Sequence, residues 1–133
     1  MEIVIIGGIA AGMGTAAKAS RENPDANITV IEKEDYISFG ACGLPYYLGN
    51  QFENENQMFA RTVDQMRNQG LDIKVRHEAT KIDYDEKVVH YKDLDTDEQK
   101  TIAYDRLVIQ QVPNQLSLKL KEWMQRTSIL SLD

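Results

Sequence analysis

The first 32 residues place a glycine-rich turn and a helix between two short apolar runs, an order compatible with few folds. Glu2 to Ile6 is β-branched without polar alternation, which predicts a strand buried on both faces. The alanine-rich segment Ala10 to Glu22 predicts a helix that ends before Pro24, and Asn27 to Glu32 predicts a second buried strand. Two such strands joined by a helix form a right-handed βαβ unit with parallel strands. The sequence therefore predicts an α/β, Rossmann-like domain.

The turn between the first strand and the helix has the glycine pattern of a phosphate-binding loop. It reads Gly7-Gly8-Ile9-Ala10-Ala11-Gly12. Gly7 allows a tight turn, Gly12 lets the helix pack close to the sheet, and free N–H groups at the helix start favour a pyrophosphate. Ile9 stands where the usual G-x-G-x-x-G has its middle glycine, so its side chain limits the approach of the backbone to phosphate. Many α/β proteins have glycines at such corners, and the turn alone leaves a purely structural role open.

Glu32 ends the second predicted strand, about twenty residues after the turn. An acidic residue at this place can accept hydrogen bonds from the ribose hydroxyls of an adenosine. The alternative is an ordinary charged residue at the end of a strand. Together with the glycine turn, Glu32 predicts a dinucleotide-binding site.

Cys42 is the only cysteine of the chain, so it forms no disulfide within it. Most free cysteines are small buried hydrophobic residues. Gly40, Gly43 and Pro45 around Cys42 instead indicate a close approach to a ligand. We therefore predict a redox role, in which the thiol passes through a sulfenic acid or a mixed disulfide with a small thiol.

The rest of the chain predicts a helical turn near Cys42 to Leu48, an irregular polar segment from Gly49 to Gln57, two further helices, and an antiparallel β-meander between two strands. Thr62 to Gln65 has the spacing of a capping box, and the helix runs to about Gln69. Asp72 to Val75 and Arg106 to Ile109 predict strands, and Leu116 to Arg126 is amphipathic and predicts a helix. Three alternating segments predict the meander: Glu78 to Tyr84, Lys87 to Lys92 and Gln99 to Tyr104. The length fits a single domain.

Composition excludes several classes of function. The net charge of −6 argues against a nucleic acid partner, although backbone N–H groups can still bind an anionic cofactor. His77 and His90 have no partner at metal-ligand spacing, so we expect no metal. No apolar segment is long enough for a membrane span or a signal peptide, and one cysteine suits a reducing compartment. We therefore expect a cytoplasmic protein without a membrane partner.

These motifs together resemble the single-cysteine flavoprotein disulfide reductases, which include coenzyme A-disulfide reductase, NADH oxidase and NADH peroxidase. The resemblance covers about Glu2 to Ile109, and the run Cys-Gly-Leu-Pro-Tyr-Tyr beginning at Cys42 is its most specific part. That run is most similar to the coenzyme A-disulfide reductase branch. The resemblance rests on Ile3 to Gly12, Ile31-Glu32-Lys33, Ile37 to Tyr47, Phe59-Ala60-Arg61-Thr62, Val75 to Asp83 and Tyr104 to Ile109.

The resemblance implies an FAD site built from the predicted nucleotide motifs. Gly7 to Gly12 would hold the pyrophosphate, Glu32 the adenosine ribose, and Cys42 would face the isoalloxazine ring. Contacts with cofactor or substrate are implied for four further residues: Lys33, Ser38, Arg61 and Ala79. Electrons would pass from NAD(P)H through FAD to Cys42. The implied partners are coenzyme A or its disulfide, or oxygen or peroxide, with a homodimer in the full-length family.

The chain departs from the family pattern at Gln110. After Tyr-Asp-Arg-Leu-Val-Ile the family continues with Ala-Thr-Gly-Ala, whereas this chain reads Gln110-Gln111-Val112-Pro113. Permitted codons for residues 110–133 can be chosen so that one added G before them shifts the reading frame and restores A-T-G-A-K-P-I-V-P-K-I-K-G-M-D-A-E-N-I-Y-F-V-S-R. We therefore expect residues 1–109 to be the N-terminal part of a truncated FAD-binding domain and residues 110–133 to be a frameshifted tail.

Three functional interpretations remain open from the sequence. The chain is an oxidoreductase by lineage with little or no turnover, a module that binds FAD or ADP without redox chemistry, or a remnant that folds and binds nothing. The first two retain the nucleotide site of Gly7 to Gly12 and Glu32.

Reading the coding DNA tests the frameshift interpretation directly. With one G added before them, the actual codons of residues 110–133 are expected to encode the family continuation without a stop codon. Codons that these residues permit can do so. A stop codon in the shifted frame, or codons that encode a different continuation, would contradict it.

Overall fold

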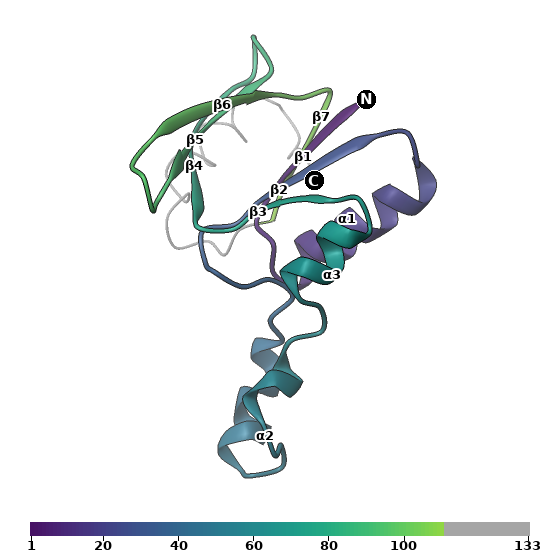
Figure 1. The fold of residues 1–133 in the computed structure, drawn as a ribbon, viewed down its shortest axis with the longest axis vertical. Coiled ribbons are helices and arrows are strands. Elements are labelled where there is room, and N and C mark those ends of the chain that lie inside the picture. The colour runs from purple at the N-terminus through teal and green to yellow at the C-terminus, as the bar shows by residue number, and fades with distance from the viewer. Residues whose placement is uncertain (111–133) are drawn as a thin grey trace, which may run out of the picture.

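The computed structural model describes residues 1–110 of the chain. Within this part, a four-stranded parallel sheet carries helices on one face and a three-stranded antiparallel sheet on the other (Figure 1). The predictions for the tail beyond Gln110, including the helix at Leu116 to Arg126, lie outside the described residues.

The parallel sheet has the strand order β3-β2-β1-β7. Its strands are β1 (Glu2–Ile6), β2 (Asn27–Ile31), β3 (Asp72–Lys74) and β7 (Arg106–Ile109). β1 pairs in parallel with β2 and β7, which confirms the predicted parallel pair. β1 is apolar at successive positions because both of its faces are covered, as the sequence predicted.

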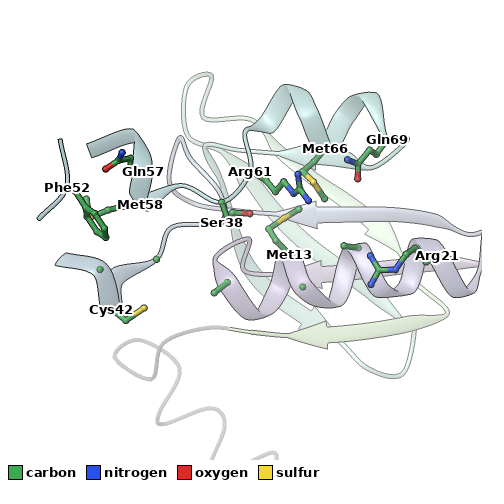
Figure 2. A pocket seen from close by; sticks show the side chains of 16 residues that line it. Met13, Arg21, Ser38, Cys42, Phe52, Gln57, Met58, Arg61, Met66 and Gln69 are labelled. Carbon is green, nitrogen blue, oxygen red and sulfur yellow. The ribbon is translucent and has the colours of Figure 1, made fainter. Parts of the chain in front are cut away.

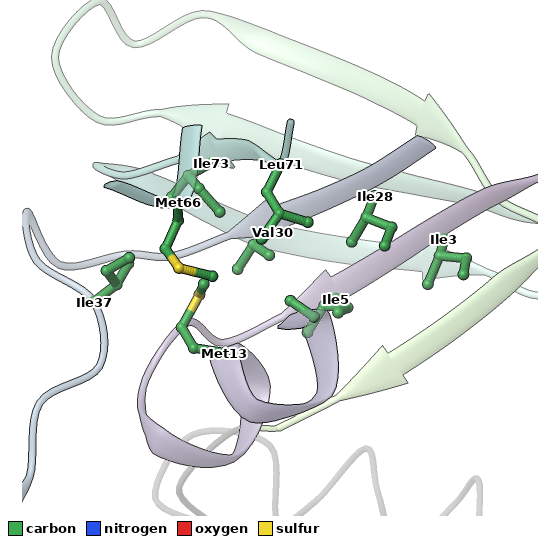
Figure 3. Close-up of a cluster of buried hydrophobic side chains, with 10 residues drawn as sticks. Ile3, Ile5, Met13, Ile28, Val30, Ile37, Met66, Leu71 and Ile73 are labelled. Atoms are coloured by element: carbon green, nitrogen blue, oxygen red, sulfur yellow. The ribbon is translucent and has the colours of Figure 1, made fainter. Parts of the chain in front are cut away.

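Helices α1 (Ala10–Glu22) and α3 (Val63–Asn68) cover one face of this sheet. Figure 3 shows the side chains of Met13 of α1 and Met66 of α3 meeting within the buried cluster that also contains the isoleucines of β1. The predicted capping box of α3 is present, since Thr62 and Gln65 exchange side-chain to backbone hydrogen bonds. The whole buried cluster comprises Ile3, Ile5, Met13, Ala16, Ile28, Val30, Ile37, Met66, Leu71 and Ile73.

The antiparallel meander covers the opposite face. It consists of β4 (His77–Asp83), β5 (Val88–Asp93) and β6 (Gln99–Ala103), as the alternating segments predicted. Val89 and Tyr91 of β5 are buried with the alternate residues of the parallel sheet, Val4, Ile6 and Ile31. Each fully buried aliphatic side chain of this kind stabilises the fold by about 1.5–3 kcal/mol.

Residues 40–58, which we call the arm, project away from the sheets (Figure 1). The arm contains the 3-10 helix Ala41–Gly43, helix α2 (Leu44–Leu48) and the 3-10 helix Glu55–Met58. The sequence predicted a helical turn near Cys42 but an irregular segment to Gln57. The second 3-10 helix forms there because the Asn54 side chain accepts a hydrogen bond from the Asn56 N–H and caps it.

An aromatic cluster fixes the base of the arm. Phe39 and Phe59 form an isolated antiparallel bridge, and their ring centroids lie 5.4 Å apart. Tyr36 contacts both rings edge-on, with centroid distances of 5.5 Å. Burial, followed by the negative charges of Glu34, Glu32 and Asp35, raises the pKa of Tyr36 above its ordinary value of 10.0.

None of the helices within residues 1–110 is long and apolar enough to cross a membrane. In the same range, no group of three or more His, Cys, Asp or Glu side chains is arranged to hold a metal ion.

The turn between β5 and β6 is organised by the carboxylate of Asp93. Its Oδ1 accepts hydrogen bonds from the N–H groups of Asp95, at 2.9 Å, and Thr96, at 3.3 Å. Its Oδ2 lies 3.5 Å from both His77 Nε2 and Lys100 Nζ. The pKa of Asp93 lies below its ordinary value of 3.8, chiefly because of the hydrogen bond from the Asp95 N–H. The bond from Thr96 and the nearby His77 and Lys100 side chains lower it further.

We expect Asp93→Asn to destabilise the chain at neutral pH but not in strong acid. Because the pKa of Asp93 is lower in the folded chain, its stabilising contribution is present above about pH 3.8 and is lost as the pH falls further. The difference in urea midpoint between wild type and variant should therefore narrow below pH 3.8. Asp85→Asn, at an exposed turn position, is the control for the lost charge. An Asp93→Asn deficit that is the same at pH 7 and in acid would contradict this account.

Candidate functional site

The glycine turn after β1 brings the start of α1 against the end of the strand. Gly7 has φ +101°, a conformation that glycine adopts without strain. A Cβ on Gly12 would overlap the carbonyl oxygen of Gly7, so only glycine allows this approach of helix and strand. Both glycines therefore have the structural roles that the sequence predicted for them.

The amino end of α1 provides N–H groups without a side-chain cap. Its N-cap residue is Ile9, which makes no side-chain capping hydrogen bond, and the first turn contains no acidic residue. First-turn N–H groups lack partners within a helix, and the helix dipole adds a partial positive charge beside them. The backbone here, following the carboxyl end of a parallel strand, fits the diphosphate of a dinucleotide.

Glu32 lies immediately after β2 and reaches back to the glycine turn. Its side chain is buried, with 5% of the residue exposed. Oε2 accepts a hydrogen bond of 2.5 Å from the Gly8 N–H, and Oε1 accepts one of 2.9 Å from the Glu34 N–H. The structure thus places a buried carboxylate beside the turn, where the sequence predicted a ribose contact.

A groove of about 550 Å³ runs from the arm along α1 (Figure 2). Cys42 is exposed and lines the groove, and Figure 2 shows its sulfur directed toward the amino end of α1. Ser38 and Arg61 line the same groove, together with Ala10. Four predicted site residues from separate parts of the sequence therefore meet at one surface.

Ser38 joins the groove to the glycine turn. Its N–H donates to the Gly8 carbonyl at 3.0 Å, and its own carbonyl accepts from the Ala60 N–H at 3.1 Å. Ser38 is buried and has φ +55°, a left-handed conformation that non-glycine residues rarely adopt and that often occurs at functional sites. The backbone of Ser38 thus fixes where the arm leaves the nucleotide turn.

Two predicted contact residues lie elsewhere. Lys33 forms an ion pair of 3.1 Å with Glu78 across the start of the meander. Ala79, on β4, packs against the buried cluster between the two sheets. Neither residue lines the groove, and their predicted contacts with the cofactor remain predictions.

The sequence patterns did not single out Arg21, which lines the far part of the groove. Ala10, Gly14, Ala17 and Arg21 follow the spacing i, i+4, i+7, i+11 and so share one face of α1. The three small residues leave a shallow channel beside α1, and the guanidinium of Arg21 lies at its far part. This spacing of small residues and an arginine is visible in the sequence and could have indicated the groove.

The comparisons with known proteins identify the family of the chain. The sequence profile described as pyridine nucleotide-disulphide oxidoreductase matches residues 1–110. The chain belongs to this family. Members of the pyridine nucleotide-disulphide oxidoreductase family are FAD-dependent, and their α/β fold is the one described above.

The individual relatives include an NADH oxidase and a coenzyme A disulfide reductase, two of the kinds of protein that the sequence resembles. An NADH oxidase of Enterococcus faecalis is 32% identical over 109 residues, which are 82% of this chain and 24% of the relative. A coenzyme A disulfide reductase of Staphylococcus haemolyticus is 29% identical over 109 residues, which are 81% of this chain and 25% of the relative. The chain spans about a quarter of the length of these curated relatives.

A solved member of the family has the same fold over the matched part. The water-forming NADH oxidase from Lactobacillus brevis, bound to NADH, superposes with a TM-score of 0.79 at 33% identity. The match covers 82% of this chain and 24% of that one.

In this chain, the geometry of the glycine turn predicts opposite effects on stability for alanine substitutions at Gly12 and Gly14. Gly12→Ala should cost about 3 kcal/mol or more of folding free energy, because the new Cβ overlaps the Gly7 carbonyl and neither backbone can move freely. Gly14→Ala, two residues further along α1, should stabilise the helix by about 0.5–1 kcal/mol. Alanine favours the helix over glycine, and no described atom lies within 4 Å of the added Cβ. Urea unfolding of both variants measures the difference. A Gly12→Ala variant as stable as wild type would rule out the close approach.

Proposed function

We propose that the chain is the part of an FAD-dependent NAD(P)H oxidoreductase that holds the ADP half of FAD and carries the redox cysteine. The observation that carries this proposal is the groove that places the only cysteine of the chain beside the amino end of α1. The family membership and the similarity to an NADH oxidase and a coenzyme A disulfide reductase support it.

The nucleotide half-site uses backbone groups and one carboxylate. Gly7 to Gly12 would bind the pyrophosphate through the N–H groups at the start of α1, and Glu32 would accept hydrogen bonds from the adenosine ribose. When bound, FAD supplies two-electron transfer between a nicotinamide and a thiol or disulfide. This chain contributes the positions of Cys42 and of the diphosphate relative to each other.

The groove fits a disulfide substrate of the coenzyme A class. Arg21 and Arg61 provide cations along it, and its small-residue face on α1 leaves space for an extended acyclic chain. In the exchange step, the Cys42 thiolate attacks one sulfur of the disulfide, forms a mixed disulfide, and releases the other half as a thiolate. One S–S bond forms as another breaks, and one thiolate is consumed as another is released, so the step needs no further oxidant or reductant.

The wider setting follows from the same chemistry. We place the protein in the cytoplasm, where a reducing environment keeps a lone thiol available, and infer a homodimer for its full-length form by lineage. Residues 1–109 form the N-terminal part of the FAD-binding domain, and residues 110–133 form the frameshifted tail. That the family match stops at residue 110 supports this division.

The substrate class is tested by the selectivity of Cys42 between disulfides. Purified chain is mixed with coenzyme A disulfide, which is anionic, or with hydroxyethyl disulfide, which is neutral, and the mixed disulfide is followed by mass. We expect a faster reaction with the anionic disulfide, and a loss of about two- to fivefold of that preference in Arg61→Gln, because one charge contact of an exposed arginine is worth about 0.5–1 kcal/mol.

Arg106→Gln is the matched control, since Arg106 lies on β7 and does not line the groove. It should keep the full preference for the anionic disulfide. A wild-type chain that reacts equally with both disulfides would refute the coenzyme A class and favour oxygen or peroxide as the acceptor of electrons from Cys42.

A further inference from the structure

The Glu32 carboxylate makes contacts within the protein that a ribose contact does not explain. Both of its oxygens accept backbone hydrogen bonds, one from the Gly8 N–H at 2.5 Å and one from the Glu34 N–H at 2.9 Å. The residue is 5% exposed, so these charge-assisted bonds are sheltered from water. Glu32 therefore ties the turn after β1 to the loop after β2.

Glu32 is itself held by two other strands. Its N–H donates to the Lys74 carbonyl at the end of β3, and its carbonyl accepts from the His77 N–H at the start of β4, both at 2.9 Å. The side chain thus extends from a backbone that both sheets fix. A peptide bonded to this carboxylate therefore takes its position from the two sheets.

Gly8 is the peptide that Glu32 fixes. Its N–H is bonded to the carboxylate, and its carbonyl accepts from the Ser38 N–H at 3.0 Å. A Cβ on Gly8 would lie only 3.2 Å from Glu32 Cβ and from Ile37 Cγ2, so the turn lies tightly against both residues. Gly8 precedes the first turn of α1, and its orientation sets where the diphosphate-binding N–H groups point.

We propose that Glu32 is a positioning residue for the diphosphate-binding turn, acting through the Gly8 N–H, in addition to its contact with the ribose. This proposal rests on the proposed nucleotide site. A carboxylate has about four lone-pair positions, so two backbone hydrogen bonds leave capacity for ribose hydroxyls. The turn is therefore ordered before any nucleotide binds.

The first test needs no ligand and compares Glu32→Gln with Glu34→Gln in the full chain. A glutamine amide presents one acceptor and one donor group, so one of the two backbone N–H groups loses its partner. We expect Glu32→Gln to lower the melting temperature by about 5–10 °C, while Glu34→Gln, at an exposed neighbouring position, removes the same charge with little effect. Equal melting temperatures for the two variants would overturn the proposal.

Amide exchange of the wild-type chain provides a second measurement, should Glu32→Gln fail to fold. The Gly8 amide is expected to exchange at least about tenfold more slowly than the Ala11 amide in the uncapped first turn of α1. A Gly8 amide that exchanges as fast as that of Ala11 would show that Glu32 does not hold the turn.

Binding of two nucleotides distinguishes a role of Glu32 in positioning the turn from a role in contacting the ribose. ADP carries both ribose hydroxyls, whereas 2′,3′-dideoxyadenosine diphosphate carries neither but has the same diphosphate. We expect Glu32→Gln to weaken binding of both by about tenfold or more, because the diphosphate contacts depend on the turn. Weakened ADP binding with unchanged dideoxy binding would leave Glu32 a ribose contact alone and refute positioning.

The two proposals fail in different ways. If the wild-type chain binds neither nucleotide, the proposed nucleotide site is wrong, and melting and amide exchange still decide whether Glu32 positions the turn. If the wild-type chain binds ADP but Glu32→Gln melts and binds as wild type does, the nucleotide site stands and the positioning role is wrong.

Discussion

The contact between the start of α1 and the end of β1 is the constraint on which the rest of the structure depends. The two glycines of the turn allow it, since a side chain at Gly12 would overlap the Gly7 carbonyl. That approach brings Met13 and Ala16 onto the isoleucines of the sheet and directs the first-turn N–H groups toward the carboxyl edge of the strands. Core packing and nucleotide binding therefore share one backbone geometry, and a change that disturbs one disturbs the other.

The arm depends on the same turn through Gly8 and Ser38. Ser38 bonds to the Gly8 carbonyl on one side and to Ala60 on the other, so both ends of the arm are fixed next to the nucleotide site. The aromatic cluster at the arm base reinforces this position. Cys42 can then lie in the groove along α1 although its own helical segment has no buried residue. A reactive thiol needs that exposure, and the fixed base supplies its location.

Much of the fold could be read from local patterns. The strand Glu2–Ile6, the helix Ala10–Glu22 and the capping box at Thr62 agree with their predicted limits, because each follows from residues adjacent in sequence. The second 3-10 helix of the arm was missed because its cap is one asparagine in a polar segment. Arg21 was missed as a groove residue because its relevance depends on the arm, which is distant in sequence.

The sequence by itself determined the βαβ unit, the need for glycine at the turn, the acidic residue after β2 and the presence of a single thiol. Only the tertiary structure decided that β7 pairs with β1 from about a hundred residues away, that β3 pairs with β2, and that Glu32 bonds to Gly8. Local sequence patterns specify which segments form helices or strands and which face of each is apolar. Pairing partners and side-chain contacts depend on which distant segments bury those faces together, and no local pattern contains that information.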